Sequence, residues 1–361
     1  MKFALPLTAL FMGLVSGLPA QAAPFTAGDI VVERIGNGSG SLSSSATPVY
    51  LDEFNSAGSL VQTIALPTTG TPLTDSGSAT SDGYLSRSTN GQVLVMPGYA
   101  ATVGTASVAS ASGISREVAV VGANGTVQLS SLGTLLSGNN VRSSASVDGG
   151  GVYAAGANGI AYINTSTSSA TMLTATSLNA RNLAIADNQL YYSTGSGTTG
   201  IYSLGAGLPT SGTSTGSLIA ASASPYAFMF ADLSSSVAGV DTLYVADDTS
   251  STGGIRKYSK AANGTWSLNN TLVLSGVRGL TGSVVGNSVQ LFATSGTNLY
   301  SFTDSSGYNA NLAGAATSLV SASTNTVFRG VALAPAVPEP ASSGLALVSL
   351  ALMGMLARKR A

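Results

Sequence analysis

Short runs of residues with strand propensity, separated by turn residues, recur through most of this chain and constrain its fold more than any other feature. Between residues 23 and 336 these runs are rich in Val, Ile, Leu, Tyr and Thr, and Gly, Asn, Asp and Ser lie between them. No long segment has apolar residues at helical spacing. Asn-Gly, the strongest short hairpin pattern, occurs at 90–91, 124–125, 158–159 and 263–264. The pattern predicts an antiparallel, all-β protein.

A repeat of about 50 residues underlies these runs, which is the size of a four-stranded β-propeller blade. Its marker is an arginine followed by small or apolar residues, a turn and a Tyr- or Val-rich run. The marker arginines are Arg87, Arg142, Arg181, Arg278 and Arg329. The gap between Arg181 and Arg278 holds two units, and a unit without arginine fits there from Tyr226. The repeat predicts six blades, starting near 85, 141, 180, 226, 277 and 328, or seven if residues 101–140 form a further short blade.

Three of these units divide into four expected strands each. The expected strands are 141–147, 151–156, 159–164 and 170–175; 180–186, 189–195, 200–205 and 216–221; and 226–232, 242–248, 253–260 and 265–273.

The two ends of the repeat region complement each other. The last unit supplies one strand, 328–333, and the N-terminal region supplies three without a leading one, 29–35, 48–54 and 60–66. Together they would form one blade that closes the propeller and removes an open sheet edge. A right-handed β-solenoid is the alternative, but it needs shorter repeats and lacks this complementarity.

Residues 1–22 have the features of a secretory signal peptide. Lys2 precedes an apolar run from Phe3 to Leu18, and Ala20-Gln21-Ala22 is a small-x-small cleavage site. The sequence therefore predicts a signal peptide at 1–22, an ectodomain at 23–336 and a separate segment at 337–361.

The C-terminal segment has three parts. Val337-Pro338-Glu339-Pro340 precedes an uncharged, largely apolar run to Ala357, and Arg358, Lys359 and Arg360 follow. The run is shorter than the roughly 20 residues that span a bilayer comfortably, and the terminal cations favour the cytoplasmic side. The order and position of these parts resemble the PEP-CTERM sorting signal of Gram-negative bacteria.

This resemblance implies a route to the cell surface. In the PEP-CTERM family an exosortase in the membrane reads the tail and cuts near Pro-Glu-Pro. The resemblance therefore implies transient inner-membrane insertion through an apolar C-terminal helix, then release to the cell surface or the exopolysaccharide matrix of a biofilm. A permanent C-terminal anchor is the alternative.

Composition excludes several classes of function. Only 8% of the residues are charged and the formal net charge is −1, so the chain is not a basic nucleic-acid-binding protein. It has no His and no Cys, which excludes Ser-His-Asp and Cys-His catalysis, thiolate chemistry, Cys/His zinc sites and disulfides.

The remaining candidates for chemistry are mostly carboxylates beside turn residues. Asp82-Gly83, Asp148-Gly149, Asp187-Asn188 and Asp304-Ser305 are expected to be turn formers. Asp52 and Glu53 lie on a predicted strand far from a propeller channel, and alternation requires one of them to face outward. Asp247-Asp248-Thr249-Ser250 offers oxygen atoms but lacks the spacing of a calcium loop, so a solvated loop is expected. We therefore expect no catalytic residue, metal or cofactor.

The five marker arginines are the candidate ligand site. Since the first strand of each propeller blade lines the channel, Arg87, Arg142, Arg181, Arg278 and Arg329 would form a partial ring at one mouth. Such a ring would concentrate positive potential and suit an acidic polysaccharide. The alternative is that each arginine donates to carbonyls or carboxylates of the neighbouring blade and ties the blades together.

These features predict a non-enzymatic, exported β-propeller with a binding or structural role in the envelope or biofilm. Its expected partners are the exosortase, exopolysaccharide or other envelope proteins, and no nucleic acid. The alternative is an exported carbohydrate-active hydrolase or lyase with carboxylate chemistry at the channel mouth. Two acids converging with a tyrosine at one mouth would favour the enzyme, and an acid-free channel would favour binding.

Overall fold

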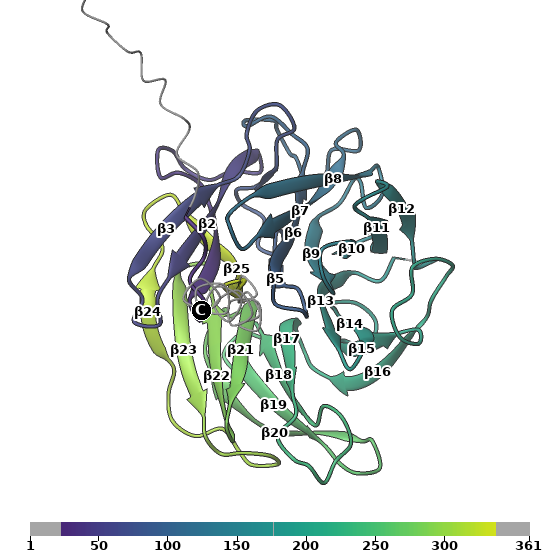
Figure 1. The fold of residues 1–361 in the computed structure, drawn as a ribbon, viewed down its shortest axis with the longest axis vertical. Coiled ribbons are helices and arrows are strands. Elements are labelled where there is room, and N and C mark those ends of the chain that lie inside the picture. The colour runs from purple at the N-terminus through teal and green to yellow at the C-terminus, as the bar shows by residue number, and fades with distance from the viewer. Residues whose placement is uncertain (1–22, 176, 337–361) are drawn as a thin grey trace, which may run out of the picture.

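The computed structural model describes residues 23–175 and 177–336, and these residues form 25 β-strands and no helix. The strands belong to four four-stranded antiparallel sheets and one nine-stranded sheet. The sheets lie around a common centre, with β5, β9, β13, β17, β21 and β25 nearest to it (Figure 1). This confirms the prediction of an all-β, propeller-like fold. The expected signal peptide and apolar sorting helix lie outside the described residues.

In the four regular sheets, strands that follow one another in the chain are also paired neighbours. The first contains β9 (Val141–Ser146), β10 (Gly151–Gly156), β11 (Gly159–Asn164) and β12 (Ser169–Met172). The second contains β13 (Ala180–Ala186), β14 (Gln189–Thr194), β15 (Gly200–Leu204) and β16 (Gly216–Ala221). The third contains β17 (Pro225–Ala231), β18 (Thr242–Asp247), β19 (Gly254–Lys260) and β20 (Trp266–Val273). The fourth contains β21 (Gly279–Val285), β22 (Ser288–Thr294), β23 (Asn298–Asp304) and β24 (Thr317–Ser321).

The nine-stranded sheet consists of two four-stranded units joined by a short strand. One unit contains β25 (Val327–Leu333), β1 (Ile30–Ile35), β2 (Ala46–Phe54) and β3 (Leu60–Ala65). The other contains β5 (Ser86–Arg87), β6 (Val93–Tyr99), β7 (Arg116–Gly122) and β8 (Val127–Gly133). The joining strand, β4 (Thr74–Ser76), pairs with both β2 and β6. Residues 101–140 thus contribute β7 and β8 to the second unit.

The predicted strands agree with the observed ones. In the units that start near 141, 180 and 226, every expected run corresponds to one strand, with ends that differ by a few residues. The solenoid alternative is wrong, because the paired strands of every sheet are antiparallel. Local alternation and turn residues were enough to place these strands, since both act within a few residues of the chain.

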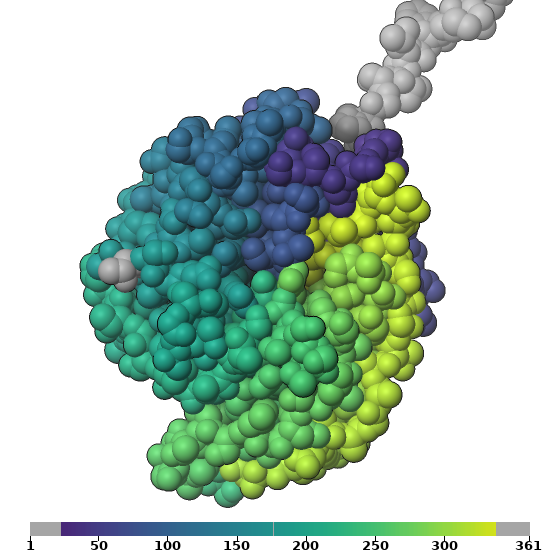
Figure 2. All heavy atoms as spheres, turned by 180° about the vertical axis from the view of Figure 1, so that it is seen from behind, coloured from purple at the N-terminus to yellow at the C-terminus, as the bar shows by residue number. Residues whose placement is uncertain are grey.

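The first and last strands of the described chain pair directly. Ile30, Val31 and Val32 of β1 lie opposite Leu333, Ala332 and Val331 of β25 in an antiparallel register. The N-terminal and C-terminal segments are accordingly side by side on the molecular surface (Figure 2).

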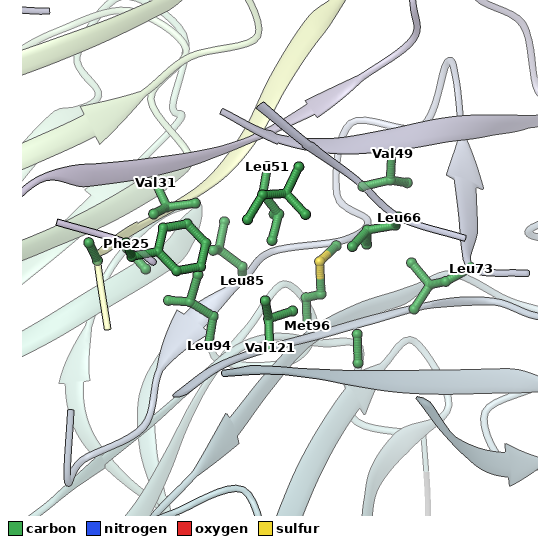
Figure 3. Close-up of a cluster of buried hydrophobic side chains, with 14 of the residues drawn as sticks. Phe25, Val31, Val49, Leu51, Leu66, Leu73, Leu85, Leu94, Met96 and Val121 are labelled. Carbon is green, nitrogen blue, oxygen red and sulfur yellow. The ribbon is translucent and has the colours of Figure 1, made fainter. Parts of the chain in front are cut away.

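Apolar side chains fill the space between neighbouring four-stranded units. Strand alternation divides them between the two faces of each unit: Val31 packs towards Leu94 and Met96 of the next unit (Figure 3). Val32, on the opposite face of β1, packs towards Phe292 of β22. Six such clusters occur among the described residues, and each joins two neighbouring units. Because both faces are covered, the strands hold their side chains in fixed positions around the centre.

Candidate functional site

Four of the five predicted arginines converge at one end of the central strands. Arg181 and Arg278 lie over the ring of Tyr226, with guanidinium carbons 4.3 and 5.0 Å from the ring centroid. Tyr226 packs against Tyr84, with ring centroids 6.1 Å apart. Arg142 and Arg329 lie on β9 and β25 at the same level. We call this end of the central strands the arginine end.

Most arginines at this end bond to the neighbouring sheet. Arg142 Nη1 donates to Asn179 Oδ1 at 2.5 Å and to the carbonyl of Ala180 at 3.3 Å. Arg181 Nη1 donates in the same way to Ser224 Oγ at 2.9 Å and to the carbonyl of Pro225 at 3.3 Å.

Arg278 forms a further link, an ion pair of 2.7 Å with Asp248. These contacts link adjacent sheets.

Arg87 lies at the other end of the central strands. In the segment that contains Arg87, Tyr84 is the residue that lies beside Arg142. The Tyr84 amide donates to the carbonyl of Arg142 at 2.7 Å. The predicted ring therefore lacks Arg87, because this segment is shifted by several residues relative to the other central strands. The Arg87 side chain is exposed, and its Nη1 donates to the carbonyl of Ala334 at 3.3 Å.

Three buried carboxyl groups lie beneath the arginine end. Glu33, Asp75 and Asp82 are each 0% exposed. Asp82 accepts hydrogen bonds from the Tyr99 hydroxyl at 2.5 Å and from the Asn140 amide. Glu33 Oε1 and Asp75 Oδ2 have no hydrogen-bond partner among the described residues.

Burial raises the pKa of all three carboxyl groups. It places the pKa of Glu33 well above the ordinary value, against the opposing charge of Arg329. For Asp75, the charges of Asp82 and Glu33 add to the effect of burial and raise its pKa further. The pKa of Asp82 is also raised by burial, although its hydrogen bonds from Tyr99 and Asn140 oppose the increase.

The two unpartnered oxygens face the same point. Glu33 Oε1 and Asp75 Oδ2 are the atoms nearest to where a Cβ on Gly83 would stand. A proton held by one carboxyl group can therefore be shared with the other, as the raised pKa values favour. Among the described residues, no three acidic side chains are arranged to hold a metal ion.

Sequence reasoning missed this cluster. Asp82 was expected to be only a turn former, whereas its side chain is buried against Tyr99. The sequence could have predicted the burial of Glu33, because Glu33 shares a strand face with the apolar residues Val31 and Ile35. Asp75 had no such pattern, since it lies on a three-residue strand.

Two other expectations for acidic residues were wrong. Asp52 and Glu53 are both buried, although alternation was expected to expose one of them. Asp52 is paired with Arg34 Nε at 2.5 Å, and Glu53 accepts the Thr26 amide at 2.6 Å. Asp247 is also buried rather than solvated, and it forms an ion pair of 3.1 Å with Arg256.

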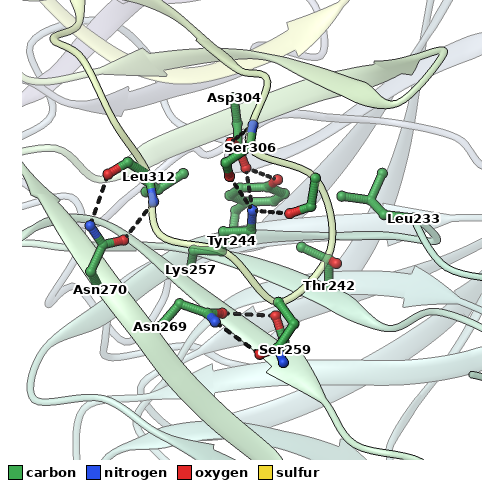
Figure 4. A network of polar contacts seen from close by, with 12 residues as sticks. Leu233, Thr242, Tyr244, Lys257, Ser259, Asn269, Asn270, Asp304, Ser306 and Leu312 are labelled. Carbon is green, nitrogen blue, oxygen red and sulfur yellow. Dashed lines mark hydrogen bonds and ion pairs between the residues drawn. The ribbon is translucent and has the colours of Figure 1, made fainter.

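A buried lysine forms a second polar cluster between neighbouring sheets. Lys257 Nζ of β19 lies 2.6 Å from Asp304 Oδ2 of β23 and donates to Ser306 Oγ and the Gly307 carbonyl (Figure 4). The Tyr244 hydroxyl donates to the same carboxylate oxygen at 2.6 Å. Burial raises the pKa of Asp304, but these hydrogen bonds outweigh it and leave the pKa below its ordinary value. All three ammonium protons have acceptors, which is the arrangement of a structural ion pair.

A cavity of about 380 Å³ opens at the end opposite the arginine end. The six strands nearest the centre, with the residues beside them, all contribute to its lining. The polar lining residues include Ser86, Arg87, Ser146, Asn182 and Thr281. Phe228, Phe230 and Met229 supply an apolar side, and no acidic residue is among the lining residues. We call it the cavity end. An adjoining hollow of about 560 Å³ shares Arg87 and Leu333 with this cavity.

The comparisons with known proteins address the tail and the fold. A model of the PEP-CTERM protein-sorting motif matches residues 336–361. The chain therefore carries this sorting signal, which implies an exported, surface-targeted substrate of an exosortase. No curated protein matches the sequence.

Solved structures with a similar fold are β-propeller proteins. A chain of the nidogen/laminin complex has 11% identity and a TM-score of 0.48, with 85% of this chain and 98% of that chain covered. A gluconolactonase from Xanthomonas campestris has 15% identity and a TM-score of 0.42, with 81% and 87% covered. A periplasmic gluconolactonase from Pseudomonas aeruginosa has 15% identity and a TM-score of 0.41, with 76% and 78% covered.

The expectation of a non-enzymatic protein is corrected by these comparisons. The similar structures include gluconolactonases, which are enzymes. A propeller-like fold is therefore no ground for calling the protein non-enzymatic.

Proposed function

We propose that this chain is an exported, exosortase-processed β-propeller that binds a saccharide segment at its cavity end. Residues 1–22 would direct export, 23–336 would form the binding domain, and 337–361 would be the sorting segment. After processing, the domain would reside at the cell surface or in the exopolysaccharide matrix, and the exopolysaccharide would be its partner.

We further propose that the binding domain is a closed propeller of six blades. The pairing of β1 with β25 supports closure, because it places strands from both ends in one four-stranded unit. The six apolar clusters also support it, since six units in a ring have six interfaces. A closed ring leaves no inter-blade face open to water.

The lining of the cavity carries the proposal of a saccharide ligand. Hydroxyl and amide groups converge there with the partly exposed apolar side chains of Met229 and Phe230. This combination suits a sugar's hydroxyls and its apolar CH face. Arg87 is the cation of this lining, and Phe230 and Asn182 lie on other strands of the same wall. A uronate-containing segment would place its carboxylate at Arg87.

Calorimetric titration with an acidic oligosaccharide and its neutral counterpart tests this proposal. We expect Arg87→Gln to weaken binding of the acidic ligand by about tenfold, the loss of one charge-assisted hydrogen bond. Lys260→Gln is the matched control, because it removes the same charge outside the cavity lining. If the wild-type protein binds neither oligosaccharide at low salt, the proposed ligand class is wrong.

The sorting proposal has its own test. Replacing Pro338, Glu339 and Pro340 by alanine should leave an unprocessed form in the inner membrane of a host that has an exosortase. Mass spectrometry of the wild-type surface protein should find no Arg358. If Arg358 is still attached, the tail is a permanent anchor instead.

A second candidate function rests on the buried carboxyl groups. Glu33, Asp75 and Asp82 converge with Tyr84 and Tyr99, and a protonated carboxyl beside an ionised one is a general acid–base pair. This observation favours a carbohydrate-active hydrolase or lyase, in which the segment over the carboxyl groups would move aside for substrate. Cleavage of an acidic polysaccharide that is abolished by Asp75→Asn would support the enzyme. Cleavage unaffected by that substitution would contradict this assignment of the residues.

A further inference from the structure

The chain leaves the propeller at the rim of the cavity end. The Ala334 amide donates to the carbonyl of Asp29 at 2.8 Å, and the Ala336 amide donates to the carbonyl of Gly91 at 2.9 Å. The carbonyl of Ala334 also accepts the hydrogen bond from Arg87. The last described residues are thus held beside the arginine that lines the cavity. The sorting segment begins from this point.

Exposed apolar side chains occur on the same face. Val147 lies on the turn between β9 and β10, and Val284 and Val285 lie at the turn between β21 and β22. Their exposed fractions are 38%, 43% and 65%. Both turns follow central strands at the cavity end, and Val285 also lines the hollow that adjoins the cavity. This face therefore projects valines around the site where the tail departs.

We propose that the cavity end lies against the phospholipid bilayer until the tail is cut, so that processing uncovers the cavity. The inference rests on the proposed sorting of this chain through its apolar tail. Only residues 337–340 separate Ala336 from the uncharged run. Four residues reach at most about 14 Å when fully extended. A tail inserted in the membrane would hold this face close to the lipid headgroups.

The charges on this face explain why the contact would end after cleavage. Asp148 and Asp187 lie exposed on the turns that follow β9 and β13 at the cavity end, and these two carboxylates outnumber Arg87, the cation of the cavity lining. Anionic lipid headgroups repel such carboxylates. A few exposed valines give little binding by themselves, whereas a short tether supplies a high effective concentration at the membrane. Cleavage removes the tether and leaves the repulsion.

Site-specific quenching in vesicles tests this orientation, and the absence of cysteine makes single labels straightforward. The full-length chain would be placed in phosphatidylethanolamine–phosphatidylglycerol vesicles that contain a lipid with a headgroup quencher. A fluorophore on Val285→Cys should be quenched several-fold more than one on Val103→Cys. Val103 is the matched control, because it is an exposed valine near the β1–β2 connection, at the arginine end.

The possible outcomes are distinct from those for the proposed function. Asn287→Cys, exposed on the same turn as Val285, provides a second cavity-end label if the first variant fails to fold. Equal quenching at both ends, or stronger quenching at Val103→Cys, would overturn the inference. Failure of saccharide binding would leave the quenching contrast unchanged. Failure of sorting would appear separately, as Arg358 retained on the surface protein.

Discussion

Ile30 of β1 lies opposite Leu333 of β25, in an antiparallel ladder that joins the two ends of the described chain. The ladder completes a four-stranded unit with β2 and β3. Ile30 and Leu333 also belong to the apolar cluster that this unit shares with β22 and β23. Loss of β25 would therefore expose both a strand edge and an apolar face.

Removal of β25 should abolish cooperative unfolding. A chain that ends at residue 326 loses the partner of β1 and one side of an inter-unit cluster, so we expect a broad, low-temperature transition in calorimetry. A chain that ends at residue 336 is the control and should retain a sharp transition. A sharp transition in the shorter chain would contradict closure of the ring.

The carboxyl pair of Glu33 and Asp75 should make stability depend on pH. Burial raises the pKa of both groups in the folded protein, so folding takes up protons. The stabilising contribution is complete below the unfolded values of about 4 and is lost as pH rises through the raised folded values. We therefore expect Asp75→Asn to match the wild type in acid and to be more stable at neutral pH.

Melting temperatures of the two proteins between pH 4 and pH 8 measure this difference. The amide mimics the protonated carboxyl group and still accepts the Ser76 amide through Oδ1, which now bonds to Asp75 at 2.7 Å. A difference that does not change with pH would show that the pair does not titrate in the folded state.

Removing one partner of the buried ion pair between Lys257 and Asp304 should strongly destabilise the fold. Lys257→Met leaves a buried carboxylate without its cation, and we expect a loss of about 3–5 kcal/mol in the free energy of unfolding. Adding Asp304→Asn removes the uncompensated charge and should restore part of the loss. Denaturant titrations of both variants give the values, and an equal loss in the double variant would exclude this electrostatic explanation.

Arg142 should contribute to stability, in contrast with Arg87. Arg142→Gln removes the hydrogen bonds to Asn179 and Ala180 in the next sheet, so the melting temperature should fall by a few degrees. Arg87→Gln should leave the melting temperature unchanged, because its side chain is exposed. An equal fall in melting temperature for the two substitutions would contradict the placement of Arg142 and Arg87 at opposite ends of the central strands.

The sequence alone determined the strands, the boundaries of the repeat and the sorting tail. Alternation and turn residues are local properties, so the runs at 141–147 or 180–186 could be placed without knowledge of their neighbours. The same local counting predicted that 29–35 and 328–333 belong to one unit, and β1 pairs with β25.

Only the tertiary structure decided which polar side chains meet. Glu33, Asp75 and Asp82 come from three separate segments, and Lys257 meets Asp304 across two sheets. Arg87 was assigned to the wrong end because the spacing within one repeat does not fix the level of its strand against the next. The position of one central strand along the next depends on contacts between sheets, such as the hydrogen bond from the Tyr84 amide to the Arg142 carbonyl. Packing between distant segments sets these positions, and a local pattern does not record which segments meet.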